Sequence, residues 1–287
     1  MTVRSGADDE RSASDARRSA TLPGRFAGRN ALVTGAASGI GKATALRLGR
    51  EGAGVACLDR DAAGLDMTVA ALAAAGARAE AIVCDIAKSA DVARASGRAI
   101  EAVGPIDALA NVAGIGDVSG HDGIENLPDD RWQRVLDVNV NGAFYLCRAL
   151  LPAMAGRGFG AVVNVSSLAG RSKSANANLA YTTSKAALLG LTRHLAFDYG
   201  RRGVRVNAIC PGGVDTPMIR SAAALAAASP EASAARAKGL AAYQFFMPIQ
   251  RMSTPDEQAA AILWLLSDDA SYVNGVSLDV NGGLYMA

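Results

Sequence analysis

From residue 30 onward, short runs of β-branched and aliphatic residues alternate with longer alanine-rich stretches that repeat apolar residues at helical spacing. The runs predict seven strands, at 31–34, 54–58, 81–83, 106–110, 161–165, 204–209 and 276–280. The stretches between them predict helices at 40–51, 62–75, 90–103, 131–155, around 181–185 and at 255–266. This alternation favours an α/β fold, namely a single-domain, doubly wound (Rossmann-type) seven-stranded parallel sheet with helices on both faces.

Length and composition agree with one large domain. The chain has 287 residues, of which 50% are hydrophobic and 20% charged, and a chain of this size can bury about three quarters of its surface in one core. A net charge of +2, without a basic stripe interleaved with aromatic residues, disfavours nucleic acid as a partner. No apolar stretch reaches the ~20 residues of a membrane span. Four widely spaced cysteines fit reduced thiols, so we expect a cytoplasmic protein.

Residues 1–25 differ from the rest of the chain. They are rich in Ser, Arg and Asp and nearly free of large apolar residues. They lack the apolar core of a secretory signal, and their acidic residues argue against a transit peptide. We expect a disordered extension over 1–25 and a folded domain over 26–287.

Tyr181 and Lys185 are four residues apart, which places them on one face of the predicted helix. A free phenol titrates near pH ~10 and is a poor base at neutral pH. A lysine ammonium about 5 Å from the phenolate, at an effective dielectric of about 20, favours ionisation by roughly 3 kcal/mol. That energy lowers the tyrosine pKa by about two units, so the phenol could exchange a proton with an alcohol or ketone. Taken alone, an ordinary helix with Tyr and Lys at this spacing is the simpler interpretation.

In a doubly wound sheet, ligands bind outside the carboxyl ends of the strands. The first strand leads into a glycine-rich turn, TGAASGIG at 34–41, and then into a helix. Glycines in this place let the backbone approach a pyrophosphate at the helix N-terminus. Asp59 ends the second strand, where a carboxylate can accept hydrogen bonds from the adenosine ribose hydroxyls. A helix N-cap before Ala62 is the alternative role of Asp59, and the two roles are compatible.

Polar groups end the later strands as well. They lie in the segments Cys84-Asp85-Ile86, Asn111-Val112-Ala113-Gly114, Asn164-Val165-Ser166-Ser167 and Cys210-Pro211-Gly212-Gly213-Val214-Asp215-Thr216. A long ligand across the sheet edge requires such groups at one strand end after another, so the pattern indicates an extended ligand.

Taken in chain order, the motifs of this sequence resemble those of the short-chain dehydrogenase/reductase family, in its compact single-domain NAD-dependent branch. They are TGAASGIG, the Asp59 strand end, DI at Asp85, NVAG, VNVNG at Asn139, NVSS, YTTSK and PGGVDT, and the match runs from about Arg25 to Gly283. The resemblance implies that Tyr181 is the general acid/base and that Ser167 hydrogen-bonds the reacting oxygen. It also implies that Lys185 grips the nicotinamide ribose and lowers the Tyr181 pKa, while Asn139 positions a water that relays protons through Lys185.

The resemblance also implies a set of cofactor-binding residues, with Asp85 on the adenine amino group and the segment after residue 210 orienting the carboxamide. The implied set is Gly35, Ser38, Gly39, Ile40, Gly41, Asp59, Arg60, Asp85, Ile86, Asn111, Ala113, Gly114, Tyr181, Lys185, Pro211, Gly212, Val214 and Thr216. No metal is expected, because His121 and His194 have no metal-like spacing with Cys or acidic residues.

The chain departs from the family pattern at two places. Val112 stands where the family usually has a second Asn, a side chain that ties strands together, so we expect little loss of activity. The interval from Ser167 to Tyr181 is 14 residues, one longer than is commonest. The choice of Ser167 rests on the S-x-A-G pattern that follows it. We expect its neighbour Ser166 to be solvated on the opposite side of the strand.

The cofactor expected is NAD. An enzyme that selects NADP needs a cation for a phosphate of charge near −2 on the adenosine ribose, whereas Asp59 places a carboxylate there. Ser38 occupies the turn position where NADP-using relatives often have Arg or Lys. Arg60 is a cation that would favour NADP instead, but its side chain can turn to solvent or lie along the adenine.

The expected function is hydride transfer between the nicotinamide and a secondary alcohol or ketone. The protein is also expected to form a homo-oligomer, a dimer or tetramer, through the helices at 131–155 and 179–199. Residues 216–251 are expected to form a substrate lid. Its apolar residues suggest an apolar or cyclic substrate, with packing of a surface helix or a subunit contact as the alternative. These residues are Met218, Ile219, Leu225, Tyr243, Phe245, Phe246 and Met247. Two other functions stay open: a non-catalytic dinucleotide-binding sensor or scaffold, and an epimerase or dehydratase on the same fold.

Overall fold

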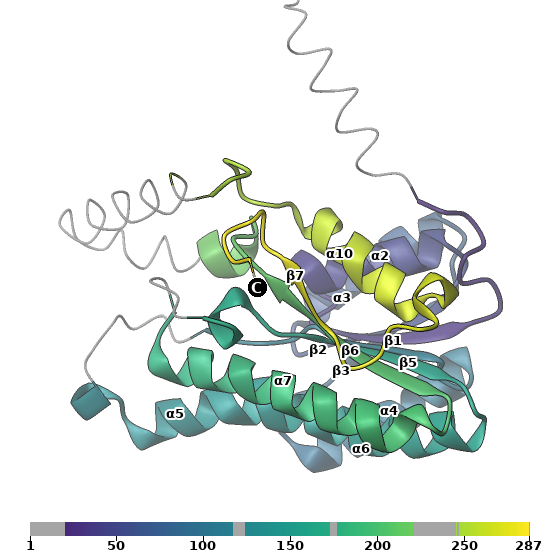
Figure 1. Ribbon diagram of the computed structural model, residues 1–287. Coiled ribbons are helices and arrows are strands. Elements are labelled where there is room, and N and C mark those ends of the chain that lie inside the picture. The colour runs from purple at the N-terminus through teal and green to yellow at the C-terminus, as the bar shows by residue number, and fades with distance from the viewer. Residues whose placement is uncertain (1–20, 117–123, 173–176, 221–244, 246, 287) are drawn as a thin grey trace, which may run out of the picture.

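The computed structural model describes residues 21–116, 124–172, 177–220, 245 and 247–286. At its centre is a seven-stranded sheet in the order β3-β2-β1-β4-β5-β6-β7, with every neighbouring pair parallel (Figure 1). The strands are β1 (Asn30–Thr34), β2 (Gly54–Asp59), β3 (Ala79–Val83), β4 (Ala108–Asn111), β5 (Gly160–Val165), β6 (Val204–Pro211) and β7 (Ser277–Val280). The predicted seven-stranded doubly wound sheet is confirmed.

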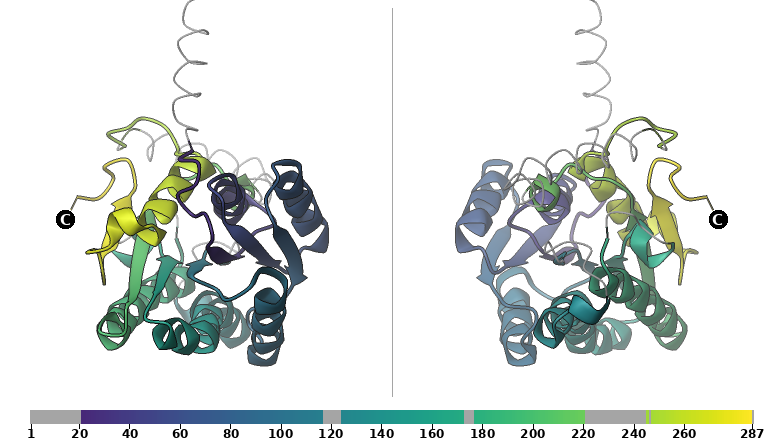
Figure 2. Two further views of the ribbon diagram at one scale, coloured as in Figure 1. Left: turned by 90° about the vertical axis from the view of Figure 1, so that its right-hand side faces the viewer. Right: turned by 90° about the vertical axis from the view of Figure 1, so that its left-hand side faces the viewer.

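Helices cover both faces of the sheet and give three layers, as the end-on views of Figure 2 show. One face carries α2 (Gly39–Arg50), α3 (Ala62–Ala74) and α10 (Pro255–Leu266). The other face carries α4 (Ser89–Val103), α5 (Asp129–Leu136), α6 (Gly142–Gly156) and α7 (Leu179–Gly200). Short turns of 3-10 helix form η1 (Ile124–Asn126), η3 (Leu168–Gly170) and η4 (Asp268–Ala270).

The central strands are buried on both sides, which explains their continuous apolar sequence. All five residues of β1 are buried, and its successive side chains point to opposite faces. Val33 therefore joins the core beneath α2 and α10, together with Leu48 and Ile262. Leu32 joins the core on the other face, together with Leu151 of α6.

The chain reverses its direction of winding between β1 and β4, which are neighbours in the sheet. A crevice opens at such a switch point outside the carboxyl ends of the strands. Thr34 ties the two strand ends together, because its hydroxyl accepts the backbone N–H groups of Val112 (2.9 Å) and Ala113 (3.0 Å). The tie between strands that was expected of an Asn at position 112 is thus supplied by Thr34 of β1.

The long helix predicted at 131–155 is interrupted. Between α5 and α6 the backbone forms one turn of π-helix, η2 (Asp137–Asn141). A π-turn inserts one residue into the helical hydrogen-bond ladder and is often found at functional sites. The apolar spacing continues through the turn, so the sequence pattern does not reveal it.

Residues 1–20 of the expected extension lie outside the described residues. The last part of the extension belongs to the folded structure: the Arg25 N–H donates to the Leu22 carbonyl at 3.2 Å, and Arg25 Nε donates to Glu51 Oε2 at 2.6 Å. Phe26, the next residue, is buried. None of the helices in the described ranges is long and apolar enough to cross a bilayer.

Candidate active site

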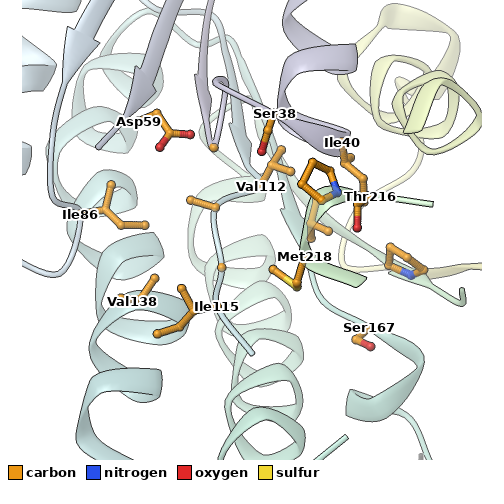
Figure 3. Close-up of a pocket in the computed structure, with 18 of the residues that line it drawn as sticks. Ser38, Ile40, Asp59, Ile86, Val112, Ile115, Val138, Ser167, Thr216 and Met218 are labelled. Atoms are coloured by element: carbon orange, nitrogen blue, oxygen red, sulfur yellow. The ribbon is translucent and has the colours of Figure 1, made fainter. Parts of the chain in front are cut away.

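A cavity of about 420 Å³ lies at the carboxyl ends of the strands. Figure 3 shows Asp59 and Ser38 at one end of it and Ser167 at the other, with Met218 and Val112 between them. Most of the predicted site residues line this cavity: Gly35, Ser38, Gly39, Ile40, Gly41, Asp59, Arg60, Asp85, Ile86, Ala113, Gly114, Ser167, Tyr181, Lys185, Pro211, Gly212, Val214 and Thr216. Asn111 and Asn139, which were also predicted, do not line it.

The glycine turn is shaped by close backbone approach. A Cβ on Gly41 would overlap the Gly35 carbonyl, and a Cβ on Gly35 would lie 3.1 Å from the Ala113 backbone. Gly35 also has a φ of +69°, in the left-handed region that favours glycine. Ser38 is the N-cap residue of α2, but its side chain makes no capping hydrogen bond. The first-turn N–H groups of an α-helix have no intrahelical partner, so this end of α2 fits a pyrophosphate.

Asp59 is held against the glycine turn by backbone amides. Its Oδ2 accepts from the Ala37 N–H at 3.1 Å, and its Oδ1 accepts from the Arg60 N–H at 2.7 Å and the Asp61 N–H at 3.1 Å. The N-cap of α3 is Asp61, which accepts from the Gly64 N–H at 3.2 Å. The N-cap role considered for Asp59 is therefore wrong. Its carboxylate keeps lone pairs for a ligand.

Asp85 also lines the cavity, and it lies near Arg134, a cationic residue that the sequence analysis did not identify. The Asp85 Oδ1 accepts from the Ala87 N–H at 3.2 Å, and its Oδ2 lies 3.8 Å from Nη1 of Arg134 in α5. Arg134 lines the cavity, as do the apolar side chains of Leu58 and Val138. Nothing in the local sequence marks Arg134, because its place depends on a contact between α5 and the distant segment after β3.

At the other end of the cavity, the Tyr181 hydroxyl is hydrogen-bonded to Ser167. Burial raises the pKa of Tyr181 above its usual value, and the bond to Ser167 offsets only part of that effect. The Lys185 ammonium lies 5.6 Å from the centre of the Tyr181 ring and donates to the Val165 carbonyl at 2.8 Å. Burial in turn lowers the pKa of Lys185 to about 8.

The prediction that the Tyr181 pKa lies below that of a free phenol is thus wrong for the protein without a bound ligand. The spacing argument used a distance but omitted desolvation, which opposes the phenolate and the ammonium alike. In this structure desolvation is the larger effect on both groups. The phenol is accordingly held in its protonated form.

Ser166 does not face solvent as expected. It is buried, and its hydroxyl donates to the Lys185 carbonyl of α7 at 2.7 Å. The chain turns sharply after β5 into η3, where the missing side chain of Gly170 allows contact with the Lys185 backbone. Ser166 therefore fastens α7 to the end of β5, while Ser167 faces Tyr181.

Asn139 lies in the π-turn and is buried. Its Oδ1 accepts from the Ile115 N–H at 2.8 Å, and its Nδ2 donates to the Ile115 carbonyl at 3.0 Å and to the Ser184 hydroxyl at 2.9 Å. The side chain is committed to the loop after β4 and to α7, which is why it does not reach the cavity.

The Asn111 side chain is likewise held away from the cavity by hydrogen bonds in the interior. Its Nδ2 donates to Asn164 Oδ1 at 2.9 Å, and Asn164 Nδ2 donates to the Thr192 hydroxyl at 2.9 Å. This buried chain of side chains links β4, β5 and α7. Asn111 was predicted, with Gly114, to border the cofactor ribose; of the two, Gly114 lines the cavity and Asn111 does not.

The wall after β6 is stiffened by a short parallel bridge between Val214 and Ser253. Beyond it Pro217, Met218 and Ile219 line the cavity. Of the other apolar residues predicted for a lid, Met247 is buried and Phe245 is 78% exposed. Leu225, Tyr243 and Phe246 lie outside the described residues.

Within the described ranges, no three His, Cys, Asp or Glu side chains are grouped so that they could hold a metal ion. His194 Nε2 lies 3.3 Å from Asp198 Oδ2 on the exposed side of α7. His121 is outside the described residues.

The glycine turn, the Asp59 carboxylate and the paired Tyr181 and Ser167 hydroxyls line one cavity at the carboxyl ends of the strands, an arrangement typical of dinucleotide-binding proteins. The chain belongs to the short-chain dehydrogenase/reductase family and is an oxidoreductase. A family model described as enoyl-(acyl carrier protein) reductase matches residues 35–285.

Three similar proteins illustrate the range of the family. A 3beta-hydroxysteroid dehydrogenase of Mediterraneibacter gnavus is 38% identical over 91% of this chain and 96% of its own length. The crystal structure of a 3-oxoacyl-[acyl-carrier protein] reductase with bound NAD from Brucella melitensis has a TM-score of 0.79 at 35% identity, covering 94% of this chain and 96% of that one. A putative NAD(P)-dependent gluconate 5-dehydrogenase from Beutenbergia cavernae, with NADP at low occupancy, has a TM-score of 0.79 at 37% identity, covering 92% and 99%.

Proposed function

We propose that this protein is an NAD-dependent dehydrogenase/reductase that interconverts a secondary alcohol and a ketone. The observation that carries the proposal is the Tyr181 hydroxyl, hydrogen-bonded to Ser167 in the same cavity as the glycine turn and Asp59. A protein that only binds a dinucleotide has no need of a phenol in the cavity with a buried lysine beside it.

The residues around the cavity fit a nicotinamide dinucleotide. The free amides at the start of α2 would hold the pyrophosphate, and Asp59 would accept from the adenosine ribose. Asp85 and Arg134 border the adenine end, while Lys185 would donate to the nicotinamide ribose. The bound cofactor would supply or accept the hydride.

In the reducing direction, Tyr181 donates its proton to the substrate oxygen. The raised pKa keeps that proton on the phenol until a more basic oxygen appears. Ser167 hydrogen-bonds the same substrate oxygen and orients it. Once the proton has moved, the Lys185 ammonium near the ring stabilises the phenolate, and the reverse steps remove the proton from an alcohol.

Asp59 is expected to decide between NAD and NADP. A close contact between its carboxylate and a 2′-phosphate costs on the order of 1–3 kcal/mol, so kcat/KM should favour NAD by about ten- to a hundredfold or more. Asp59→Ala should narrow that gap, measured on one substrate with both cofactors. Equal values in the wild type, or an unchanged gap in the variant, would show that Asp59 is not the discriminating residue.

Asp61 offers a matched control for this experiment. It is an acidic residue two positions along the chain, but its carboxylate caps α3 and does not line the cavity. Asp61→Ala should destabilise the protein by about 0.5–2 kcal/mol while leaving the ratio of the two kcat/KM values unchanged.

The substrate is expected to be mostly apolar. Ile115, Met218 and Ile219 line the cavity beyond Val112, and apolar walls favour cyclic or aryl alcohols over polyols. A panel of alcohols and ketones of similar size, read at the NADH absorbance, tests this. Sugars or polyols turning over much faster than cyclic alcohols would overturn the substrate class, and a lack of net NADH formation with every alcohol would favour the epimerase or dehydratase alternative.

Three wider expectations complete the proposal. The catalytic domain includes residues 26–287, with a substrate lid at 216–251, and residues 22–25 pack onto it. The protein works in the cytoplasm. It assembles as a homo-oligomer through the helices at 131–155 and 179–199, where α6 and α7 expose Phe144 (41%) and Phe197 (81%). Large exposed aromatic side chains on neighbouring helices are typical of an interaction surface.

A further inference from the structure

Helix α7 carries two buried hydroxyls that make the same pair of hydrogen bonds. The Ser184 hydroxyl accepts from Asn139 Nδ2 at 2.9 Å and donates to the Tyr181 carbonyl at 2.7 Å. The Thr192 hydroxyl accepts from Asn164 Nδ2 at 2.9 Å and donates to the Leu188 carbonyl at 2.7 Å. Neither hydroxyl is exposed at all, and neither residue lines the cavity.

The two pairs differ in what they join. Asn164 belongs to β5, so the Thr192 pair fastens the middle of α7 to the sheet. Asn139 belongs to the π-turn and also holds both backbone groups of Ile115, a residue of the cavity wall. The Ser184 pair therefore joins the cavity wall to the first turns of α7, where Tyr181 lies.

The backbone of Tyr181 is held from both sides. Its N–H donates to Oδ1 of Asn178, the N-cap residue of α7, at 3.0 Å, and its carbonyl accepts from Ser184. A serine hydroxyl bonded to a carbonyl of the preceding turn usually competes with the helix and bends it. Here the same hydroxyl is also held by Asn139, so its bond to the Tyr181 carbonyl ties the first turn of α7 to the cavity wall.

We infer that Ser184 is a positioning residue for Tyr181, and that the chain Ile115–Asn139–Ser184 fixes the first turn of α7 so that the phenol meets Ser167. Ser184 touches no reacting atom. The inference rests on the proposed function, because positioning matters only if Tyr181 transfers the proton. A reacting group displaced by about 1 Å can lose about a hundredfold in rate.

The test compares Ser184→Ala with Thr192→Val. Each variant removes one buried hydroxyl with the same two bonds, and both should lower the melting temperature. Ser184→Ala is expected to lower kcat by about ten- to a hundredfold, with KM and the Kd for NADH within about twofold of wild type. Thr192→Val is expected to keep kcat within about twofold.

Hydrogen exchange gives a readout that needs no substrate. Ser184→Ala should speed amide exchange in the turn around Tyr181, and Thr192→Val should speed it only further along α7. The inference is overturned if Ser184→Ala keeps the wild-type kcat, if both variants lose kcat equally, or if exchange around Tyr181 is unchanged. A failure of the proposed function would show differently, as activity retained by Tyr181→Phe.

Discussion

Replacing Tyr181 with phenylalanine is expected to lower kcat by a factor of about 10³ or more, while the Kd for NADH stays close to that of wild type. The ring is half-buried, so phenylalanine keeps its packing and removes only the hydroxyl that meets Ser167. Loss of an interaction made at the reacting oxygen lowers kcat and kcat/KM together. Steady-state kinetics on the best substrate of the alcohol panel, with NADH binding followed by fluorescence, provides both numbers.

Lys185→Ala is the comparison variant for the Tyr181→Phe experiment. Lys185 lies beside the Tyr181 ring and also faces the cavity where the cofactor ribose is expected. Its loss should therefore weaken NADH binding as well as kcat. Retention of more than a tenth of the wild-type activity by Tyr181→Phe would mean that another group transfers the proton.

Replacing Glu51 with glutamine is expected to lower the free energy of unfolding by about 3–5 kcal/mol. Glu51 is fully buried at the end of α2, where its carboxylate pairs with Arg25 at 2.6 Å and with Arg47 at 3.2 Å. Arg47 also reaches Asp256 of α10 at 3.1 Å. Removing the charge of Glu51 leaves guanidinium groups in a buried site without their central partner, which is far more costly than losing a surface ion pair.

Glu80→Gln is the control for the Glu51 experiment. Glu80 pairs with Arg98 at 2.6 Å, but the two side chains are 33% and 59% exposed. An exposed pair contributes about 0–1 kcal/mol, so this variant should unfold at nearly the same urea concentration as wild type. Equal shifts for both variants would show that the Glu51 network adds no more than a surface contact.

The sequence was sufficient for the sheet and most of the helices, because these follow from local patterns. The strand runs have the length and β-branched content of buried parallel strands. The helix predicted at 255–266 has the observed bounds, since Thr254, Pro255 and Glu257 form an N-terminal capping box with proline in the first turn. Eighteen of the predicted site residues line the cavity, because strand ends of one parallel sheet meet at one edge.

What the sequence did not reveal depends on contacts between distant segments. Asn139 and Ser184 are 45 residues apart, and Asn111 and Asn164 are 53 apart. Asn139 and Asn111 therefore use their amide N–H groups in the interior instead of at the cavity. Ser166 and Ser167 are neighbours with identical side chains, and only the packing of η3 against α7 decides which one faces Tyr181. The raised pKa of Tyr181 likewise reflects burial, which a spacing of four residues does not report.

The most direct test of the account follows the hydride itself. The enzyme is incubated with a cyclic ketone and with NADH that carries deuterium at both positions of nicotinamide C4, and the alcohol is analysed by mass spectrometry. The account predicts one deuterium on the carbinol carbon with the wild-type enzyme, and almost no product over the same time with Tyr181→Phe. An alcohol product without deuterium, or no reduction of any ketone in the panel, would contradict it.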